Sequence, residues 1–252
     1  MNREDLQKYI GITGYSLGQV EKDYFQHIVL SALSRKIAGQ LVFKGGTALQ
    51  KIGIIDRFSE DLDFTAKKDI SIEHIRDICS NAINTYNFVV ESDKVVQDIR
   101  TTSFRLKIQG PLFKNQRGIC TIRVEISKRE PVILKPQRNE FTPAYNDILP
   151  YFIENMDLEE ILAEKIRTIY TRNKARDLYD IYKINKKQVP LKIELVNKKL
   201  AFYNLSFDKE VFLKKCNEIQ PYWNSELQSL IENVVTFIEA FESVKMKVRD
   251  TQ

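Results

Sequence analysis

The sequence has few of the residues that build zinc sites or histidine-dependent catalytic centres. Its 252 residues include two histidines, His27 and His74, and three cysteines. Cys79, Cys120 and Cys216 lie far apart and match no metal-ligand spacing. We therefore expect buried thiols rather than a disulfide framework or a zinc site. If the protein is an enzyme, carboxylates and lysines must carry its chemistry.

Long apolar segments are also absent. No run approaches the roughly 18 residues that cross a bilayer, and residues 1–9 lack the apolar stretch of a signal peptide. The sequence thus predicts a cytoplasmic protein with no membrane partner. Lys plus Arg (39) exceed Asp plus Glu (34) by 5, a small excess that permits binding of polyphosphate or nucleic acid without requiring it.

Periodicity predicts an α+β protein with two parts. Residues 1–149 combine strand and helix patterns, which predicts a mixed sheet flanked by helices, whereas residues 150–252 read as a helical domain. Residues 131–150 hold four of the seven prolines and are expected to form an irregular connection. The predicted strands are 41–43, 61–65, 88–96, 103–109 and 119–127, and the longer predicted helices are 20–37, 71–86, 157–172, 176–185 and 225–246.

The segment around Asp61-Leu62-Asp63 is the most informative. Side chains two apart on a strand share a face, so Asp61 and Asp63 should project together. Two adjacent carboxylates repel each other unless a cation lies between them. The alternative is a solvated strand end, and Asp-x-Asp alone favours that alternative.

Two further features favour a binding site. Gly45-Gly46 follows a predicted strand and precedes a short helix that Thr47 could cap, and paired glycines let a backbone approach phosphate closely. Glu125 shares one face of its predicted strand with Arg123, so it could supply a third carboxylate. A plain turn and an exposed, solvated sheet face are the respective alternatives.

Together these residues resemble the DNA polymerase β nucleotidyltransferase superfamily, in which a Gly-Gly or Gly-Ser turn precedes Asp-x-Asp and a later strand supplies a third acid. Residues 43–49 (FKGGTAL) and 57–64 (RFSEDLDF) resemble more specifically the AbiEii/AbiGii toxin family. The third acid is Glu125 where many superfamily members have Asp. The resemblance implies a polymerase β-type domain with Mg²⁺ (or Mn²⁺) on the catalytic acids Asp61, Asp63 and Glu125, and a nucleoside triphosphate (NTP) contacted by Lys44, Gly45, Gly46, Thr47, Arg57 and Ser59.

The helical part extends the resemblance. Lys165 falls within the apolar stripe of its helix, where it must either extend to solvent or meet an anion. Arg176-Asp177-Leu178-Tyr179-Asp180 follows, and its charges could be surface ion pairs. AbiEii-like proteins carry a lysine on a helix and then an Arg-Asp-x-x-Asp helix. The resemblance implies that Lys165 contacts the triphosphate and that one aspartate supports the site; we favour Asp177 as catalytic and place Asp180 with the nucleotide contacts.

The predicted activity is Mg²⁺-dependent transfer of a nucleoside monophosphate (NMP) from an NTP. The resemblance implies a toxin of a type IV toxin–antitoxin or phage-defence system, with RNA such as tRNA as acceptor and a cognate antitoxin encoded nearby. Arg138, Arg172 and Lys174 are among the basic residues that could contact RNA. Transfer to a small molecule or a protein hydroxyl, and a non-catalytic nucleotide-binding role, are the alternatives.

Overall fold

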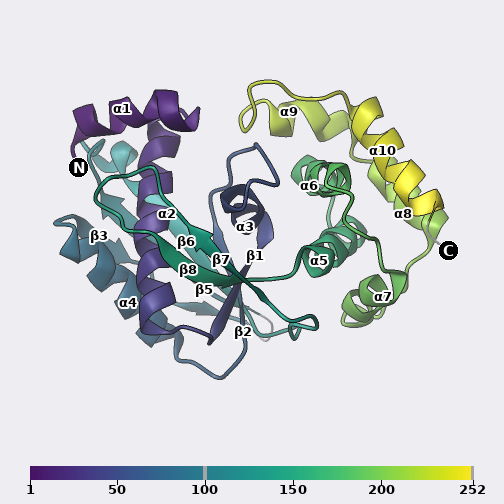
Figure 1. Ribbon diagram of the computed structural model, residues 1–252, viewed down its shortest axis with the longest axis horizontal. Helices are drawn as coiled ribbons and strands as arrows, with labels where there is room; N and C mark the ends of the chain where they lie inside the picture. The colour runs from purple at the N-terminus through teal and green to yellow at the C-terminus, as the bar shows by residue number, and fades with distance from the viewer. Residues whose placement is uncertain (99–100, 251–252) are drawn as a thin grey trace. The chain divides into compact units, whose positions relative to one another are not determined.

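The computed structural model describes residues 1–98 and 101–250, which divide into two units (Figure 1). It confirms the predicted α+β class, with a mixed sheet flanked by helices and a helical C-terminal region. None of the described helices is both long and apolar enough to span a membrane. The first unit comprises Met1–Ala48, Glu60–Val132 and Pro136–Asn155, and the second comprises Leu49–Ser59, Ile133–Lys135 and Met156–Gln252.

An eight-stranded sheet forms the centre of the first unit. Its strands follow the order β3-β5-β6-β2-β1-β8-β7, and β4 pairs with β5. The sheet is mixed because β2 runs antiparallel to β1 but parallel to β6. The strands are β1 (Leu41–Lys44), β2 (Leu62–Ala66), β3 (Val89–Ser92), β4 (Val96–Gln97), β5 (Thr101–Gln109), β6 (Cys120–Ser127), β7 (Gln137–Phe141) and β8 (Tyr151–Asn155).

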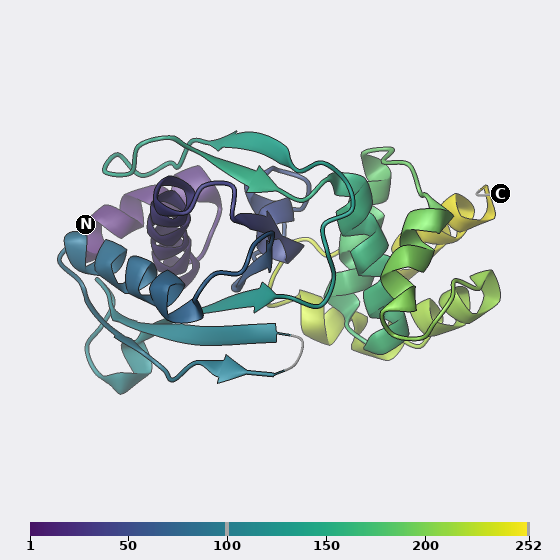
Figure 2. The same ribbon diagram turned by 90° about the horizontal axis from the view of Figure 1, so that it is seen from below.

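Helices cover one face of this sheet. α2 (Leu17–Lys36) contacts β6 and β8, and α4 (Ile72–Thr85) contacts α2, β3 and β5. Figures 1 and 2 show both helices against the strands, with the sheet curving around α2. α1 (Arg3–Thr13) packs on α2, and α3 (Gly45–Lys51) follows β1 directly. The apolar core lies under α2 and α4.

Strand register decides which residues face the helices. Phe43, Phe64 and Ile126 occupy neighbouring positions on β1, β2 and β6, and all three are buried. The residues next to them in sequence therefore point to the other side, because side chains alternate along a strand. We call that other side the open face; it carries the partly or fully exposed Asp63, Ser103, Arg105, Arg123 and Glu125, together with the buried Lys44.

The second unit is built from helices. α5 (Leu158–Thr171) packs on α6 (Ala175–Lys186) and α7 (Ile193–Ala201), and α6 also contacts α10 (Phe237–Arg249). Leu162, Leu178, Leu200 and Trp223 are among its buried apolar side chains. The remaining helices are α8 (Lys209–Asn217) and α9 (Trp223–Leu227), with short 3₁₀ turns at Gln116–Gly118 in the first unit and Gln220–Tyr222 in the second.

Three features differ from the sequence prediction. The proline-rich stretch contains β7, an edge strand whose exposed polar residues lack the alternation of a half-buried strand. The predicted helix 225–246 is interrupted: α9 ends at Leu227, α10 begins at Phe237, and the Trp223 indole donates a hydrogen bond to the Val235 carbonyl. The predicted division at residues 149 and 150 falls before β8, which completes the sheet of the first unit.

Candidate functional site

A row of polar residues crosses four adjacent strands on the open face. Lys44 of β1 pairs in register with Asp63 of β2, and Asp63 with Glu125 of β6. Glu125 in turn pairs with Ser103 of β5. Directly paired residues have neighbouring Cβ atoms on the same side of the sheet. The structure therefore brings together three residues that the sequence placed in the site, and adds Ser103.

Gly45 and Asp63 approach each other closely. Gly45 has a φ of +76°, a left-handed conformation that side-chain-bearing residues rarely adopt. A Cβ atom at Gly45 would come within 2.4 Å of the Asp63 Oδ2 atom. The absence of a side chain at Gly45 thus leaves room for the Asp63 carboxylate. This contact gives the Gly45-Gly46 motif a steric reason beyond a simple turn.

Thr47 fixes the loop that carries Asp61. The Thr47 hydroxyl donates a hydrogen bond to the Asp61 carbonyl oxygen at 2.5 Å, and Thr47 is fully buried. The predicted role of Thr47 as a helix cap is wrong, because α3 already begins at Gly45. Asp61 itself lies immediately before β2, two residues from Asp63. The short helix α3 and the approach to β2 are therefore tied together beside the row.

The donors at this place fit a hard cation. Mg²⁺ prefers oxygen ligands and is usually held by one or two carboxylates together with substrate phosphates. Asp61 and Asp63 are both partly exposed and could supply those carboxylates. Within the described ranges, no three His, Cys, Asp or Glu side chains come close enough together to hold a metal by themselves. Asp61 and Asp63 are therefore residues that could hold a divalent cation.

Glu125 is held by an arginine on its own strand. The Arg123 Nη2 atom lies 2.7 Å from Glu125 Oε2, and the same nitrogen lies 3.5 Å from the Ser103 hydroxyl. Side chains two apart on a strand share a face, so this pair lies flat on the open face. The positive guanidinium balances the Glu125 carboxylate beside Asp63. The sequence pattern placed Arg123 and Glu125 on one face but did not show that they bond.

Four other predicted residues meet in the second unit, in a buried ion-pair cluster of Arg57, Lys165, Asp177 and Asp180. Lys165 Nζ lies 3.0 Å from Asp177 Oδ1 and 2.6 Å from Asp180 Oδ2. Arg57 donates two hydrogen bonds of 2.7 Å to the Asp180 carboxylate. Arg172 donates to both oxygens of Asp177. Both aspartates are fully buried, so they are not surface ion pairs, and Lys165 does not extend to solvent.

The cluster keeps its aspartates ionised. Burial alone would raise the pKa of Asp177, but the neighbouring Lys165 and Arg172 outweigh it and hold that pKa below its usual range. The pKa of Asp180 is likewise lowered, because Arg57 and Lys165 outweigh the effect of burial. Paired buried charges of this kind fix the packing of α5, α6 and the segment that carries Arg57.

Three of the predicted contacts have structural partners in the second unit. The Ser59 amide donates a 2.8 Å hydrogen bond to the Gln50 side chain. Arg172, a predicted RNA contact, is bonded to Asp177, and Lys174 lies 3.2 Å from Glu226. These interactions hold loops of the second unit in place.

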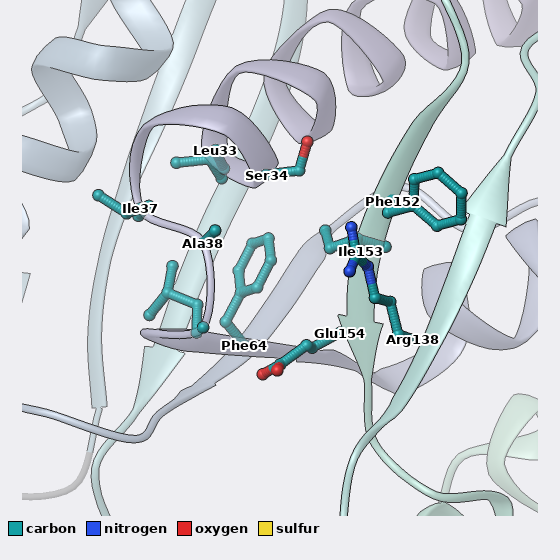
Figure 3. Close-up of a pocket in the computed structure, with 11 residues that line it drawn as sticks. Leu33, Ser34, Ile37, Ala38, Phe64, Arg138, Phe152, Ile153 and Glu154 are labelled. Atoms are coloured by element: carbon teal, nitrogen blue, oxygen red, sulfur yellow. The ribbon is translucent and has the colours of Figure 1, made fainter.

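A pocket opens elsewhere in the first unit (Figure 3). It has a volume of about 210 Å³ and lies between the C-terminal end of α2 and strands β1, β2, β7 and β8. Leu33, Ile37 and Phe64 line its apolar part, while Arg138 and Glu154 provide charges. Asp61, Asp63 and Glu125 are not among the residues that line it. The pocket is therefore separate from the candidate site.

The family model described as "Nucleotidyl transferase AbiEii toxin, Type IV TA system" matches residues 29–247. The chain belongs to this family. AbiEii membership makes it a nucleotidyl transfer enzyme and a member of a toxin family, as the sequence motifs predicted. No curated protein shows significant similarity to the chain.

Solved structures share the fold of this AbiEii protein. MenT4, a nucleotidyltransferase toxin from Mycobacterium tuberculosis H37Rv, matches with a TM-score of 0.65 and 19% identity over 100% of this chain and 91% of that one. JHP933 from Helicobacter pylori matches with a TM-score of 0.60 and 18% identity over 93% of this chain and 91% of that one. At these identities the likeness concerns the fold.

Sequence reasoning missed two contributors to the open face. Ser103 and Arg105 lie on β5, and nothing in the local pattern of that strand marks them as functional. Their register with Glu125 and Arg123 is what places them near the carboxylates. The alternation of β5 predicted which residues share a face, but it could not predict the partners across the strands.

Proposed function

We propose that this AbiEii protein transfers an NMP from an NTP to an acceptor hydroxyl, most readily that of RNA such as tRNA. The observation that carries the proposal is the row of Lys44, Asp63 and Glu125 on the open face. It combines an ammonium, two carboxylates and the adjoining glycine turn, which are the elements that phosphoryl transfer requires. Cognate-antitoxin binding is a further proposal, supported by the type IV toxin–antitoxin description of the family.

Asp61 and Asp63 would hold Mg²⁺ or Mn²⁺, with Glu125 as the third acid. When bound, the metal would supply positive charge to the triphosphate and acidify the attacking hydroxyl. The acceptor oxygen bonds to the α-phosphorus, the bond from that phosphorus to the bridging oxygen breaks, and pyrophosphate leaves. Glu125 is proposed to accept the hydroxyl proton on Oε1, because its Oε2 atom is paired with Arg123.

The protein's own groups would position the triphosphate. Gly45, Gly46 and Thr47 are proposed to lie along its phosphates, because the paired glycines let the backbone at the start of α3 approach an anion closely. Lys44 contributes a positive charge beside Asp63. Lys165 remains a proposed phosphate contact, with Asp177 and Asp180 as supporting acids and Arg57 and Ser59 as nucleotide contacts. To contact a phosphate, the Lys165 ammonium would exchange one of its two carboxylate partners, Asp177 or Asp180, for a phosphate oxygen.

The first test is transfer of label from each α-labelled NTP to total tRNA in the presence of Mg²⁺. We expect label on RNA with the wild-type protein and at least a ~10³-fold lower rate with Asp63→Asn, because the isosteric amide cannot neutralise a cation. Asp69→Asn is the matched control, since the Asp69 side chain is 97% exposed. Circular dichroism should show that both variants fold.

Each other outcome changes the proposal in a defined way. If Asp63→Asn retains transfer, the assignment of Asp63 as a metal ligand is contradicted. Label on the protein itself would redirect the search to a protein hydroxyl, and label on a small molecule from cell extract would identify a metabolite acceptor. Binding of NTP without any transfer would favour a non-catalytic role in this chain.

A further inference from the structure

Two arginines lie directly opposite each other on the open face. Arg105 of β5 pairs in register with Arg123 of β6. Like charges at directly opposed positions destabilise an antiparallel pair of strands. Arg105 is exposed, and the Arg123 side chain is 41% exposed. The sheet therefore keeps an unfavourable pair of cations at its surface, although the exposed Arg105 could be replaced by a neutral residue without disturbing the core.

The two arginines differ in what holds them. Arg123 is anchored by Glu125 at 2.7 Å and approaches the Ser103 hydroxyl at 3.5 Å. Arg105 makes no ion pair within the part of the chain that the structure describes. The pair thus combines one oriented guanidinium with one that can turn toward a ligand. Lys107, the next basic residue on this face of β5, is already paired with Asp93 at 2.6 Å.

The chemistry of the pair selects a phosphate. A guanidinium presents a planar fork of N–H donors that matches two phosphate oxygens, and it stays charged at every physiological pH. Two such forks on neighbouring strands can hold one phosphate from two sides. Binding there would also relieve the repulsion between the arginines, so the anion gains a favourable interaction that a lone surface arginine does not provide.

The arginine pair lies apart from the residues proposed to bind the triphosphate. Arg123 lies two residues before Glu125 on β6, and Arg105 lies one strand beyond, which places the pair on the order of 8 Å from the Glu125 backbone. Gly45, the proposed triphosphate contact, lies on the other side of Asp63, at the end of β1. The carboxylates therefore stand between Gly45 and the arginines. An acceptor strand that brings its hydroxyl to the carboxylates would extend its backbone over Arg105.

We propose that Arg105 and Arg123 bind a backbone phosphate of a polynucleotide acceptor, close to its reacting end. This inference rests on the proposed transfer to RNA and adds the surface that holds the acceptor. The phosphate is a phosphodiester of the acceptor strand and not a phosphate of the NTP. Arg105 is the residue to test, because Arg123 also touches Glu125 and its replacement would disturb the carboxylates.

The test measures binding without catalysis. Fluorescence anisotropy of a labelled single-stranded RNA 12-mer with a free 3′-hydroxyl is titrated with the wild type, Arg105→Gln and Arg105→Lys at several salt concentrations. Arg76→Gln is the matched control: it removes the same charge from α4, the helix on the opposite face of the sheet. Calorimetric titration with ATP and with GTP reports binding of the triphosphate by the same proteins.

We expect Arg105→Gln to weaken RNA binding at least tenfold, the loss typical of one charge-assisted hydrogen-bonded contact, and to reduce the slope of log K against log salt by about 0.7. Arg105→Lys should retain the slope but lose part of the affinity, because it keeps the charge and lacks the fork. NTP binding should be unchanged. Without RNA, Arg105→Gln should unfold at a slightly higher temperature than Arg76→Gln, since it removes the repulsion.

Equal RNA binding by Arg105→Gln and Arg76→Gln would overturn the proposal. Weaker NTP binding with unchanged RNA binding would also overturn it, and would assign the pair to the triphosphate. The two levels of inference can fail separately. Transfer to RNA that does not depend on Arg105 would support the proposed function and contradict the arginine site. RNA binding that depends on Arg105, without any transfer, would support the arginine site and contradict the proposed function.

Discussion

Gly45 combines a left-handed backbone with a close approach to the Asp63 carboxylate. Its backbone is left-handed, with a φ of +76°, and the space where a Cβ would lie is filled by the Asp63 carboxylate. Gly39 and Gly53 have the same backbone conformation, φ +72° in each, but no atom within 4 Å of a Cβ position. At those two positions glycine is needed only for the turn. At Gly45 it is needed for the turn and for the position of Asp63.

Gly45→Ala should therefore reduce transfer far more than it reduces stability. The strained backbone costs about 1–2 kcal/mol, as in any left-handed alanine. The clash with Asp63 Oδ2 must also displace that carboxylate, and displacements near 1 Å can lower a rate by about 10²-fold. The measurement pairs the rate of transfer with the free energy of unfolding in urea.

Gly39→Ala is the matched control, because it adds the same backbone strain in the first unit without a steric contact. We expect it to lose similar stability and to keep its rate within a few-fold. If both variants lose activity in proportion to stability, the contact between Gly45 and Asp63 has no catalytic importance.

At the scale of elements, what could be predicted from the sequence was local. The two-residue period of strands places Asp63 and Glu125 on definite faces, and helical periodicity located α2, α5 and α6. β7 could not be predicted, because most residues of this edge strand are exposed. Its sequence therefore lacks the alternation of apolar and polar residues that marks a half-buried strand. The pairing of Asp63 with Glu125, and of Arg105 with Arg123, depends on contacts between distant segments that local patterns do not contain.

The same limit applies to helices α5 and α6. The sequence places Lys165 among apolar residues, and Asp177 and Asp180 on one helix face. This pattern allows Lys165 either to extend to solvent or to bind an anion. The structure closes the question: all three are buried together with Arg57. The arginine comes from residues 49–59, more than a hundred positions earlier, and no periodicity could have indicated it.

The cluster that joins α5 and α6 should make stability fall at low pH. The folded-state pKa of Asp177 lies below its unfolded value of about 3.9. Its contribution is therefore fully present above about pH 4 and is lost as the pH falls toward the folded pKa. Asp177→Asn should remove part of this dependence, and at pH 7 it should destabilise the protein by about 3–5 kcal/mol, since Lys165 and Arg172 lose a buried partner.

Urea unfolding at pH 7, 4 and 3 provides the measurement. The wild type should lose stability steeply between pH 4 and 3, and the difference between it and Asp177→Asn should shrink over the same interval. Asp77→Asn is the control, because the Asp77 side chain is 61% exposed in its pair with Arg76. Parallel curves for the wild type and Asp177→Asn would show that Asp177 gains no stabilisation from its charge.

At the scale of the whole molecule, neither unit is a continuous segment. The second unit takes Leu49–Ser59 from the middle of the first. That short piece provides Arg57 to the buried Asp180, Ile55 and Phe58 to the apolar interior, and a backbone hydrogen bond of 3.1 Å from Phe58 to Leu230. Asp56 accepts a hydrogen bond from the Tyr179 hydroxyl and pairs with Lys183 at 3.0 Å. A cut at the end of β8 would remove all of these contacts.

Residues 156–252 expressed alone should therefore lack a cooperative thermal transition, because Asp180 would lose Arg57 and retain only Lys165 in an apolar setting. Residues 49–59 joined to 156–252 through a flexible Gly/Ser linker should recover the transition, whereas the same fusion carrying Arg57→Gln should not recover it fully. Calorimetry of the three proteins measures this directly. A cooperative transition in 156–252 alone, at the temperature of the fusion, would show that these helices are stable without residues 49–59.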